Sequence, residues 1–73
     1  MKRYIAAMDQ GTTSSRTILF DGDGRPVSCA QEEFRQLYPK PGWVEHDCRD
    51  IVNSQLNSFR AALGKCGASA EEI

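Results

Sequence analysis

The segment from Asp9 to Arg16 combines side chains that suit a phosphate ligand. Gly11 allows a tight turn whose backbone amides can face an anion. Neighbouring hydroxyls, which add further donors, belong to Thr12, Thr13, Ser14 and Ser15. Asp9 offers a carboxylate for Mg²⁺ and its waters, and Arg16 adds a fixed positive charge. Because an ordinary hairpin turn uses the same residue types, the pattern alone leaves a plain turn open.

Two apolar runs flank this segment and predict β-strands. The runs cover residues about 4–8 and about 15–20, and each suits a central strand covered on both faces. Two successive Asp-Gly pairs at 21–24 then predict a hairpin turn. A more polar third strand follows at about 26–35. The expected sheet is therefore an antiparallel meander of three strands.

One amphipathic helix is predicted over residues 48–66. Asp47 suits the N-cap and Gly67 the C-cap. The residues at helical spacing, expected to form one buried stripe, are Ile51, Val52, Gln55, Leu56, Phe59, Ala62, Leu63 and Cys66. Residues 37–46 contain two prolines and predict a loop. One helix covers one face of a sheet, so the chain predicts the opening part of a larger α/β domain.

Several other residues resemble ligands but have simpler explanations. The sequence has no Cys-x-x-Cys pair, so we do not predict a zinc site from Cys29, His46, Cys48 and Cys66. Trp43 and His46 are expected to belong to a loop that packs over the sheet and leads into the helix. Glu45 and Asp47 are expected to neutralise the helix N-terminus rather than to act as an acid/base pair.

Composition excludes several classes of partner. The 73 residues include nine basic and ten acidic side chains, giving a net charge of -1, and neither sign forms a run. This balance argues against a nucleic-acid-binding module. No apolar stretch is long enough for a membrane span or a signal-peptide core. The three widely spaced cysteines suggest free thiols. We therefore expect a cytoplasmic protein without a membrane partner.

Two motifs together resemble a known family. The first is Asp9-Gln10-Gly11-Thr12-Thr13-Ser14-Ser15-Arg16, and the second is Tyr38-Pro39-Lys40-Pro41-Gly42-Trp43-Val44-Glu45-His46-Asp47. Their order and spacing closely resemble the N-terminus of the glycerol kinases, which are carbohydrate kinases on the actin and hexokinase type of ATPase fold. Cys48 departs from the family's usual proline at the first helical position, a change that affects local stability more than chemistry.

The resemblance implies the fold and the site. Residues 1–73 would be the first part of a ribonuclease H-like (actin-type) ATPase domain. Asp9 would organise Mg²⁺ through water, while Gly11, Thr12, Thr13, Ser14 and Arg16 would contact the phosphates of ATP. Thr12 would also lie near the phosphate of the product. The general base would lie beyond residue 73, so the resemblance implies no catalytic residue within the chain.

The resemblance also implies the partners of the intact protein. These would be ATP or ADP, Mg²⁺ and glycerol, with glycerol 3-phosphate as the product. A homo-oligomeric parent is left open. Two alternatives stay open as well: another sugar kinase of the same family with a pentulose or polyol substrate, and a truncated remnant without activity.

Overall fold

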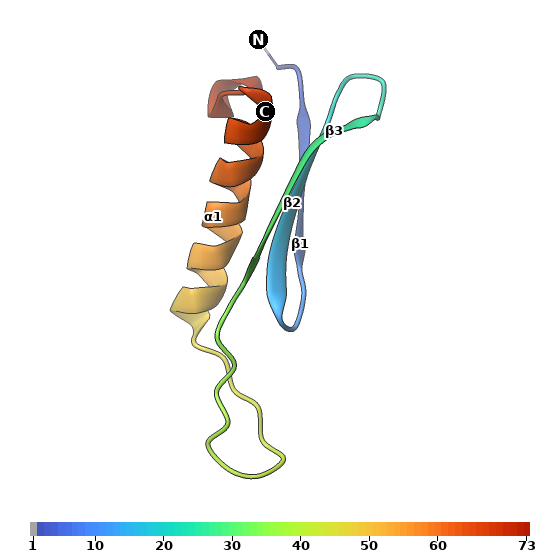
Figure 1. The fold of residues 1–73 in the computed structure, drawn as a ribbon. Coiled ribbons are helices and arrows are strands. Elements are labelled where there is room, and N and C mark those ends of the chain that lie inside the picture. The colour runs from blue at the N-terminus through green and yellow to red at the C-terminus, as the bar shows by residue number, and fades with distance from the viewer. Residues whose placement is uncertain (1) are drawn as a thin grey trace.

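The computed structural model describes residues 2–73, and in it one helix lies along one face of a three-stranded sheet (Figure 1). The strands are β1 (Ile5–Gln10), β2 (Ser14–Phe20) and β3 (Pro26–Glu33). The helix α1 (Cys48–Cys66) is followed by a short 3₁₀ helix, η1 (Ala70–Glu72). Neighbouring strands are antiparallel and lie in the order β1-β2-β3. The predicted meander with one helix is therefore confirmed.

β1 differs from the strand that the sequence predicted. It runs two residues further, to Gln10, and it lies at an edge of the sheet. Within residues 2–73 only β2 pairs with it, and α1 packs mainly on β2 and β3. Ile5 and Met8 are accordingly 67% and 51% exposed. Within the described residues β1 has one neighbouring strand, and no second layer covers the sheet. The central strand covered on both faces was predicted for a larger domain, so for β1 it stays a prediction.

A small apolar core lies between α1 and the two strands beneath it. Leu19 of β2, Ala30 of β3 and Ala62 of α1 are its buried members. Partly buried side chains surround them, including those of Phe59 and Ile73. Three residues of modest size make a thin core, so hydrogen bonds across the sheet–helix interface must contribute to holding α1 in place.

The buried stripe of α1 is more polar than predicted. Its buried residues are Ser54, Ser58 and Ala62, whereas Val52 and Leu56 are 56% and 42% exposed. Steps of four residues place the three small side chains on one face of the helix. The predicted stripe is therefore wrong for Val52 and Leu56. The hydroxyl side chains of β2 face α1 and need hydrogen-bonding partners, which the serines provide.

Both ends of α1 are capped by the expected residues. The Asp47 side chain accepts a hydrogen bond of 2.9 Å from the backbone N–H of Arg49, and this bond lowers the pKa of Asp47. Gly67 ends the helix in the left-handed conformation, with φ of 70°. In residues 2–73 no helix is long and apolar enough to cross a membrane.

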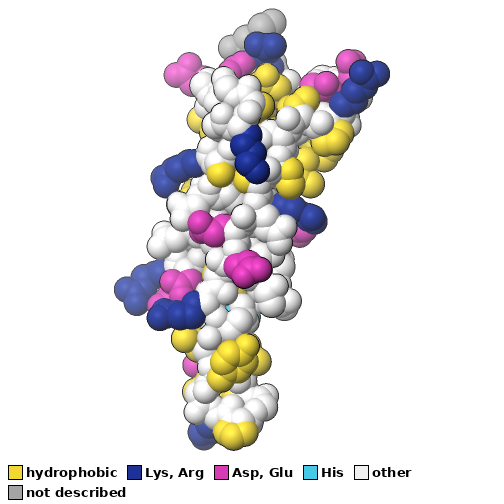
Figure 2. Space-filling view, in the orientation of Figure 1, with side chains coloured by type: hydrophobic (Ala, Val, Ile, Leu, Met, Phe, Trp, Pro, Cys, Tyr) yellow, Lys and Arg dark blue, Asp and Glu magenta, His cyan; other side chains and the backbone are white. Residues whose placement is uncertain are grey.

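The loop between β3 and α1 extends beyond the sheet (Figure 1). Leu37 and Glu45 pair through two backbone hydrogen bonds of 2.7 and 2.8 Å, which close the base of the loop. At its tip Tyr38 and Trp43 are 71% and 54% exposed, and Figure 2 shows hydrophobic side chains there. The expectation that this loop packs over the sheet is therefore wrong for its tip, since its closed base directs residues 38–44 away from the strands.

Candidate phosphate-binding hairpin

Half of the six predicted site residues lie on strands, because β1 and β2 extend close to the turn: Asp9 is on β1, and Ser14 and Arg16 are on β2. Only 11–13 form the turn itself. Asp9 and Arg16 are directly opposite each other in the β1–β2 register. The Arg16 Nη2 atom donates to Asp9 Oδ2 at 2.9 Å, while both side chains stay well exposed, Asp9 64% and Arg16 45%. The structure thus brings the predicted magnesium ligand and the predicted phosphate cation together as an accessible ion pair.

Ser14 and Arg16 share the face of the sheet that points away from α1. Gln31 on β3 lies opposite Arg16 and donates from Nε2 to Ser14 Oγ at 2.8 Å. Sequence reasoning missed Gln31. Along the third strand, side chains alternate between the two faces of the sheet, and this alternation was the only sign that Gln31 could lie near the site. To place Gln31 opposite Arg16 one must also know the strand register. Gln31 orients the Ser14 hydroxyl beside the ion pair.

The three carbonyl oxygens of the turn all accept hydrogen bonds. Gly11 O accepts from Gln10 Nε2 at 3.2 Å, and Thr13 O accepts from the backbone N–H of Phe34 at 3.2 Å. Thr12 O accepts from Gln36 Nε2 at 3.4 Å. Three donors, from β1 and from the segment after β3, therefore hold three consecutive peptide groups of the turn in one orientation.

The amide groups of the same turn point the other way. In a trans peptide the C=O and N–H are antiparallel, so carbonyls that face donors of the protein direct the following N–H groups outward. Within the described residues, the N–H groups and hydroxyls of Thr12 and Thr13 form no hydrogen bond. Both residues are exposed. Free donors gathered in this way suit the oxygens of a phosphate group.

Gly11 is needed in this turn for reasons of space. Its N–H donates to Ser14 O at 2.9 Å, so the backbone doubles back closely on itself. A Cβ atom placed on Gly11 would lie 3.1 Å from the same Ser14 oxygen, which is tighter than an ordinary contact. A larger residue would require the Ser14 carbonyl to move by a few tenths of an ångström, so this close turn favours glycine.

The remaining hydroxyl of the segment faces the helix instead of the turn. Ser15 is fully buried, and its Oγ atom lies 2.7 Å from Ser54 Oγ and 2.9 Å from Gln10 Oε1. The Gln10 side chain thereby links the helix to Gly11 O. Ser15 supports the hairpin from inside and does not face a ligand.

The donor set of the hairpin fits magnesium only together with a phosphate. Among residues 2–73, no group of three or more His, Cys, Asp or Glu side chains is placed to hold a metal ion. Asp9 is a single accessible carboxylate beside free amides and hydroxyls. Such a carboxylate suits a Mg²⁺ ion whose other ligands are waters and phosphate oxygens.

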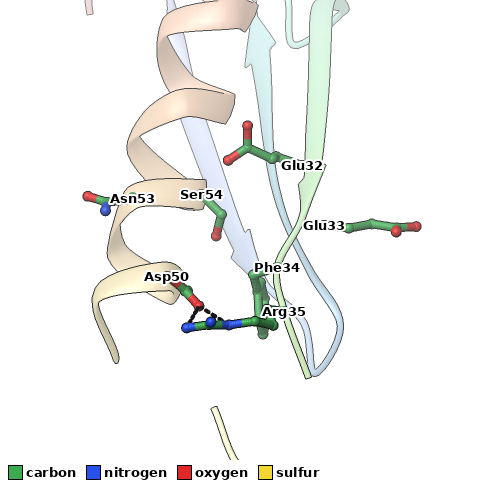
Figure 3. Close-up of a pocket in the computed structure, with 7 residues that line it drawn as sticks. All are labelled: Glu32, Glu33, Phe34, Arg35, Asp50, Asn53 and Ser54. Atoms are coloured by element: carbon green, nitrogen blue, oxygen red, sulfur yellow. Dashed lines mark hydrogen bonds and ion pairs between the residues drawn. The ribbon is translucent and has the colours of Figure 1, made fainter. Parts of the chain in front are cut away.

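A separate open pocket of about 420 Å³ lies between the end of β3 and the first turns of α1 (Figure 3). It contains none of the predicted site residues; its lining consists of Glu32, Glu33, Phe34, Arg35, Asp50, Asn53 and Ser54. Arg35 is already paired with Asp50, with a distance of 3.2 Å between Nη2 and Oδ2. With three carboxylates against one engaged cation, this pocket does not suit a phosphate.

Comparison with known proteins identifies the group to which these features belong. The chain is 56% identical over 70 residues to a glycerol kinase of Leptothrix cholodnii, 52% identical over 73 residues to one of Treponema denticola, and 49% identical over 73 residues to one of Caldanaerobacter subterraneus. These alignments cover 96–100% of this chain but only 14–15% of each relative.

The match extends to the family level. The family model described as "FGGY family of carbohydrate kinases, N-terminal domain" matches residues 4–73, so it includes both motifs, all three strands and the helix. The resemblance drawn from the two motifs is thereby confirmed. The chain belongs to the FGGY family of carbohydrate kinases, within whose N-terminal domain it lies.

Proposed function

We propose that the protein carrying this chain is an ATP-dependent glycerol kinase. It would transfer the γ-phosphoryl group of MgATP to a hydroxyl of glycerol and release glycerol 3-phosphate and ADP. One observation carries the proposal: a hairpin with free backbone amides, hydroxyls and an accessible Asp–Arg pair, in a chain about half identical to proteins named glycerol kinase. Because the chain spans about 15% of those relatives, the activity is proposed for the longer polypeptide.

Each residue of the hairpin has a distinct proposed role. Asp9 holds Mg²⁺ through its water ligands, and Arg16 neutralises phosphate charge. The amides and hydroxyls of Thr12 and Thr13 bind phosphate oxygens, with Thr12 closest to the phosphate of the product. The Ser14 hydroxyl adds a donor, and Gly11 gives the backbone its close turn. Phosphoryl transfer depends mainly on positioning and charge stabilisation, which these groups supply when MgATP is bound.

No residue of the chain is assigned as the general base. Taking a proton from the acceptor hydroxyl requires a group within hydrogen-bond reach of that substrate. We place that group, and the glycerol site, beyond residue 73. Residues 1–73 are accordingly proposed as the N-terminal part of the first domain, without activity by themselves.

Asp9→Asn in the full-length polypeptide tests the role of the hairpin. The change keeps the shape of the side chain but removes the charge that holds the hydrated metal. We expect kcat/KM for MgATP to fall about 10- to 100-fold, the range seen when groups that support a metal site are lost. The Mg²⁺ concentration for half-maximal rate should rise. Asp23→Asn is the matched control, because Asp23 lies in the exposed turn between β2 and β3. Wild-type kinetics for Asp9→Asn would disprove the assigned role.

A substrate panel tests the choice of acceptor. The family includes carbohydrate kinases in general, so a pentulose or another polyol is the competing acceptor. ADP release would be measured with glycerol, other polyols and pentuloses at equal concentration. We expect the highest kcat/KM with glycerol. A higher value with a pentulose would overturn glycerol as the substrate and keep the kinase assignment.

A further inference from the structure

The second motif, residues 38–47, has no role in the phosphate site described so far. It is nevertheless connected to the turn through the side chain of Gln36. Gln36 lies between β3 and the loop, and its Nε2 atom lies 3.4 Å from Thr12 O and 3.2 Å from Phe34 O. Its Oε1 atom lies 2.6 Å from His46 Nε2. A continuous path of hydrogen bonds therefore joins the end of the second motif to the centre of the turn.

The donor and acceptor roles in this path follow from its surroundings. The Gln36 Nε2 atom faces two carbonyl oxygens, and only the NH₂ end of an amide can satisfy both. The Oε1 end is then turned towards His46 and can only accept. His46 must therefore donate from Nε2, as it does in the neutral tautomer protonated there and in the imidazolium form. His46 fixes the Gln36 amide, and Gln36 in turn holds the Thr12 carbonyl.

The backbone places these side chains together. The two hydrogen bonds between Leu37 and Glu45 close the loop base and bring Gln36 and His46 side by side although they are ten residues apart. Phe34 adds a second support: its ring meets the His46 ring edge-on at 5.2 Å between centroids. Its backbone N–H also donates to Thr13 O at 3.2 Å. Phe34, Gln36 and His46 thus form one unit behind the turn.

We propose that Gln36 and His46 are positioning residues for the phosphate-binding turn. By holding the Thr12 carbonyl on the protein side, Gln36 keeps the N–H of Thr13 directed outward, because the two groups belong to one trans peptide. His46 prevents the Gln36 amide from rotating. Neither side chain touches the ligand. The inference rests on the proposed function, since it assigns these residues to the binding of a nucleotide phosphate.

Three variants of the full-length polypeptide test the proposal. Gln36→Met keeps the length of the side chain and removes the amide. His46→Phe keeps the ring against Phe34 and removes the N–H. His46→Gln keeps a donor and is the rescue variant. Glu45→Gln is the matched control, because its exposed side chain in the same segment forms no hydrogen bond within the described residues.

The primary measurement is the dissociation constant for MgADP by isothermal titration, together with KM for MgATP and for the acceptor. Gln36→Met and His46→Phe should each raise the nucleotide constants about three- to tenfold, the range for one oriented hydrogen bond. KM for the acceptor should stay at the wild-type value. The double variant should be no worse than either single variant, because the two residues act in series. His46→Gln should restore most of the affinity.

Two results would overturn the proposal. Nucleotide constants equal to wild type in folded Gln36→Met would show that the turn does not need Gln36. A lowered Tm with equal losses for nucleotide and acceptor would show a merely structural role. If the wild-type protein binds no MgADP, the proposed function fails instead. The backbone ¹⁵N order parameter of Thr13 then tests whether Gln36 holds the peptide group between Thr12 and Thr13 in one orientation. A lower order parameter in Gln36→Met than in the wild type supports this, and an unchanged value contradicts it.

Discussion

Two buried hydroxyls of β2 connect the sheet to the helix at the residue scale. Ser15 and Thr17 are fully buried, and each meets a serine of α1, with Oγ–Oγ and Oγ1–Oγ distances of 2.7 and 2.8 Å. No buried side-chain oxygen or nitrogen within residues 2–73 is left without a partner. Such hydroxyl pairs specify one position of the helix along the strand, since a shifted helix would leave them unsatisfied.

The Thr17–Ser58 pair predicts a measurable coupling. Thr17→Val is nearly isosteric and leaves Ser58 Oγ and Gln55 Nε2 each with one partner fewer. We expect it to lower the opening free energy of α1 by about 1–2 kcal/mol, and Ser58→Ala to do the same. The double variant should lower the opening free energy of α1 by less than the sum of the two single effects. In the double variant no hydroxyl of this pair is left facing an apolar group.

Native-state amide hydrogen exchange along α1 measures this opening free energy directly. Thr13→Val is the matched control: Thr13 is exposed, so the same chemical change there should move α1 protection by at most about 0.5 kcal/mol. Strictly additive effects of Thr17→Val and Ser58→Ala would contradict the pairing.

These residue-scale links could not be predicted from the sequence. The types and spacing of Asp9 to Arg16 predict a candidate phosphate-binding turn, with a plain hairpin turn as the alternative, because a glycine beside hydroxyls and charges is a local pattern. Whether Ser15 faces the ligand or the helix depends on the strand register. The support from Gln36 depends on a loop closure that no local pattern encodes. The sequence therefore identifies the hairpin but not the side chains that hold it.

At the scale of the element, one glycine inside α1 and the glycine that caps it should respond in opposite ways to the same substitution. Gly64 lies within the helix, and an added Cβ would meet no atom within 4 Å. Gly64→Ala should therefore stabilise the fold by about 0.5–1 kcal/mol. Gly67 has a φ of 70°, which an alanine adopts only with strain, so Gly67→Ala should destabilise it by about 1–2 kcal/mol.

Thermal unfolding of the two variants beside the wild type provides the measurement. Each glycine serves as the control for the other, since both changes add one methyl group to an exposed position at the C-terminal end of α1. A rise of Tm for Gly67→Ala would mean that the left-handed cap at Gly67 does not persist in solution, and a fall for Gly64→Ala would contradict the prediction for the helix interior.

The residues at which the helix begins and ends were predicted more accurately than the position of each element in the fold. Asp47 and Gly67 mark the ends of α1 through their own backbone and side-chain preferences, and the structure has both caps there. The position of β1 in the sheet depends on strands and layers that lie far away in sequence. An apolar run such as 4–8 indicates a strand, but it does not say whether that strand lies at the centre or at an edge.

At the scale of the whole molecule, residues 2–73 leave one face of the sheet uncovered. The described chain measures 49 × 18 × 15 Å, and its radius of gyration of 14.4 Å exceeds the value of about 11 Å for a compact domain of this size. Away from α1, Ile5, Ile18, Phe20 and Val27 lie on neighbouring strands of one face. Ile5 and Val27 are 67% and 41% exposed. One layer of helix on one layer of sheet leaves this apolar surface in water.

This open face predicts the behaviour of the 73-residue chain expressed alone. Apolar side chains on neighbouring strands should bind a hydrophobic dye and promote self-association, because burying them is favourable. We expect dye fluorescence and an apparent mass that rise with protein concentration, and a broad thermal transition. Ile5→Lys should reduce both signals by placing a charge in the open face. Val44→Lys is the matched control, since Val44 is 56% exposed on the distant loop. A monomeric chain that binds no dye and melts cooperatively would mean that this face is stable in water and that residues 1–73 fold as an independent unit.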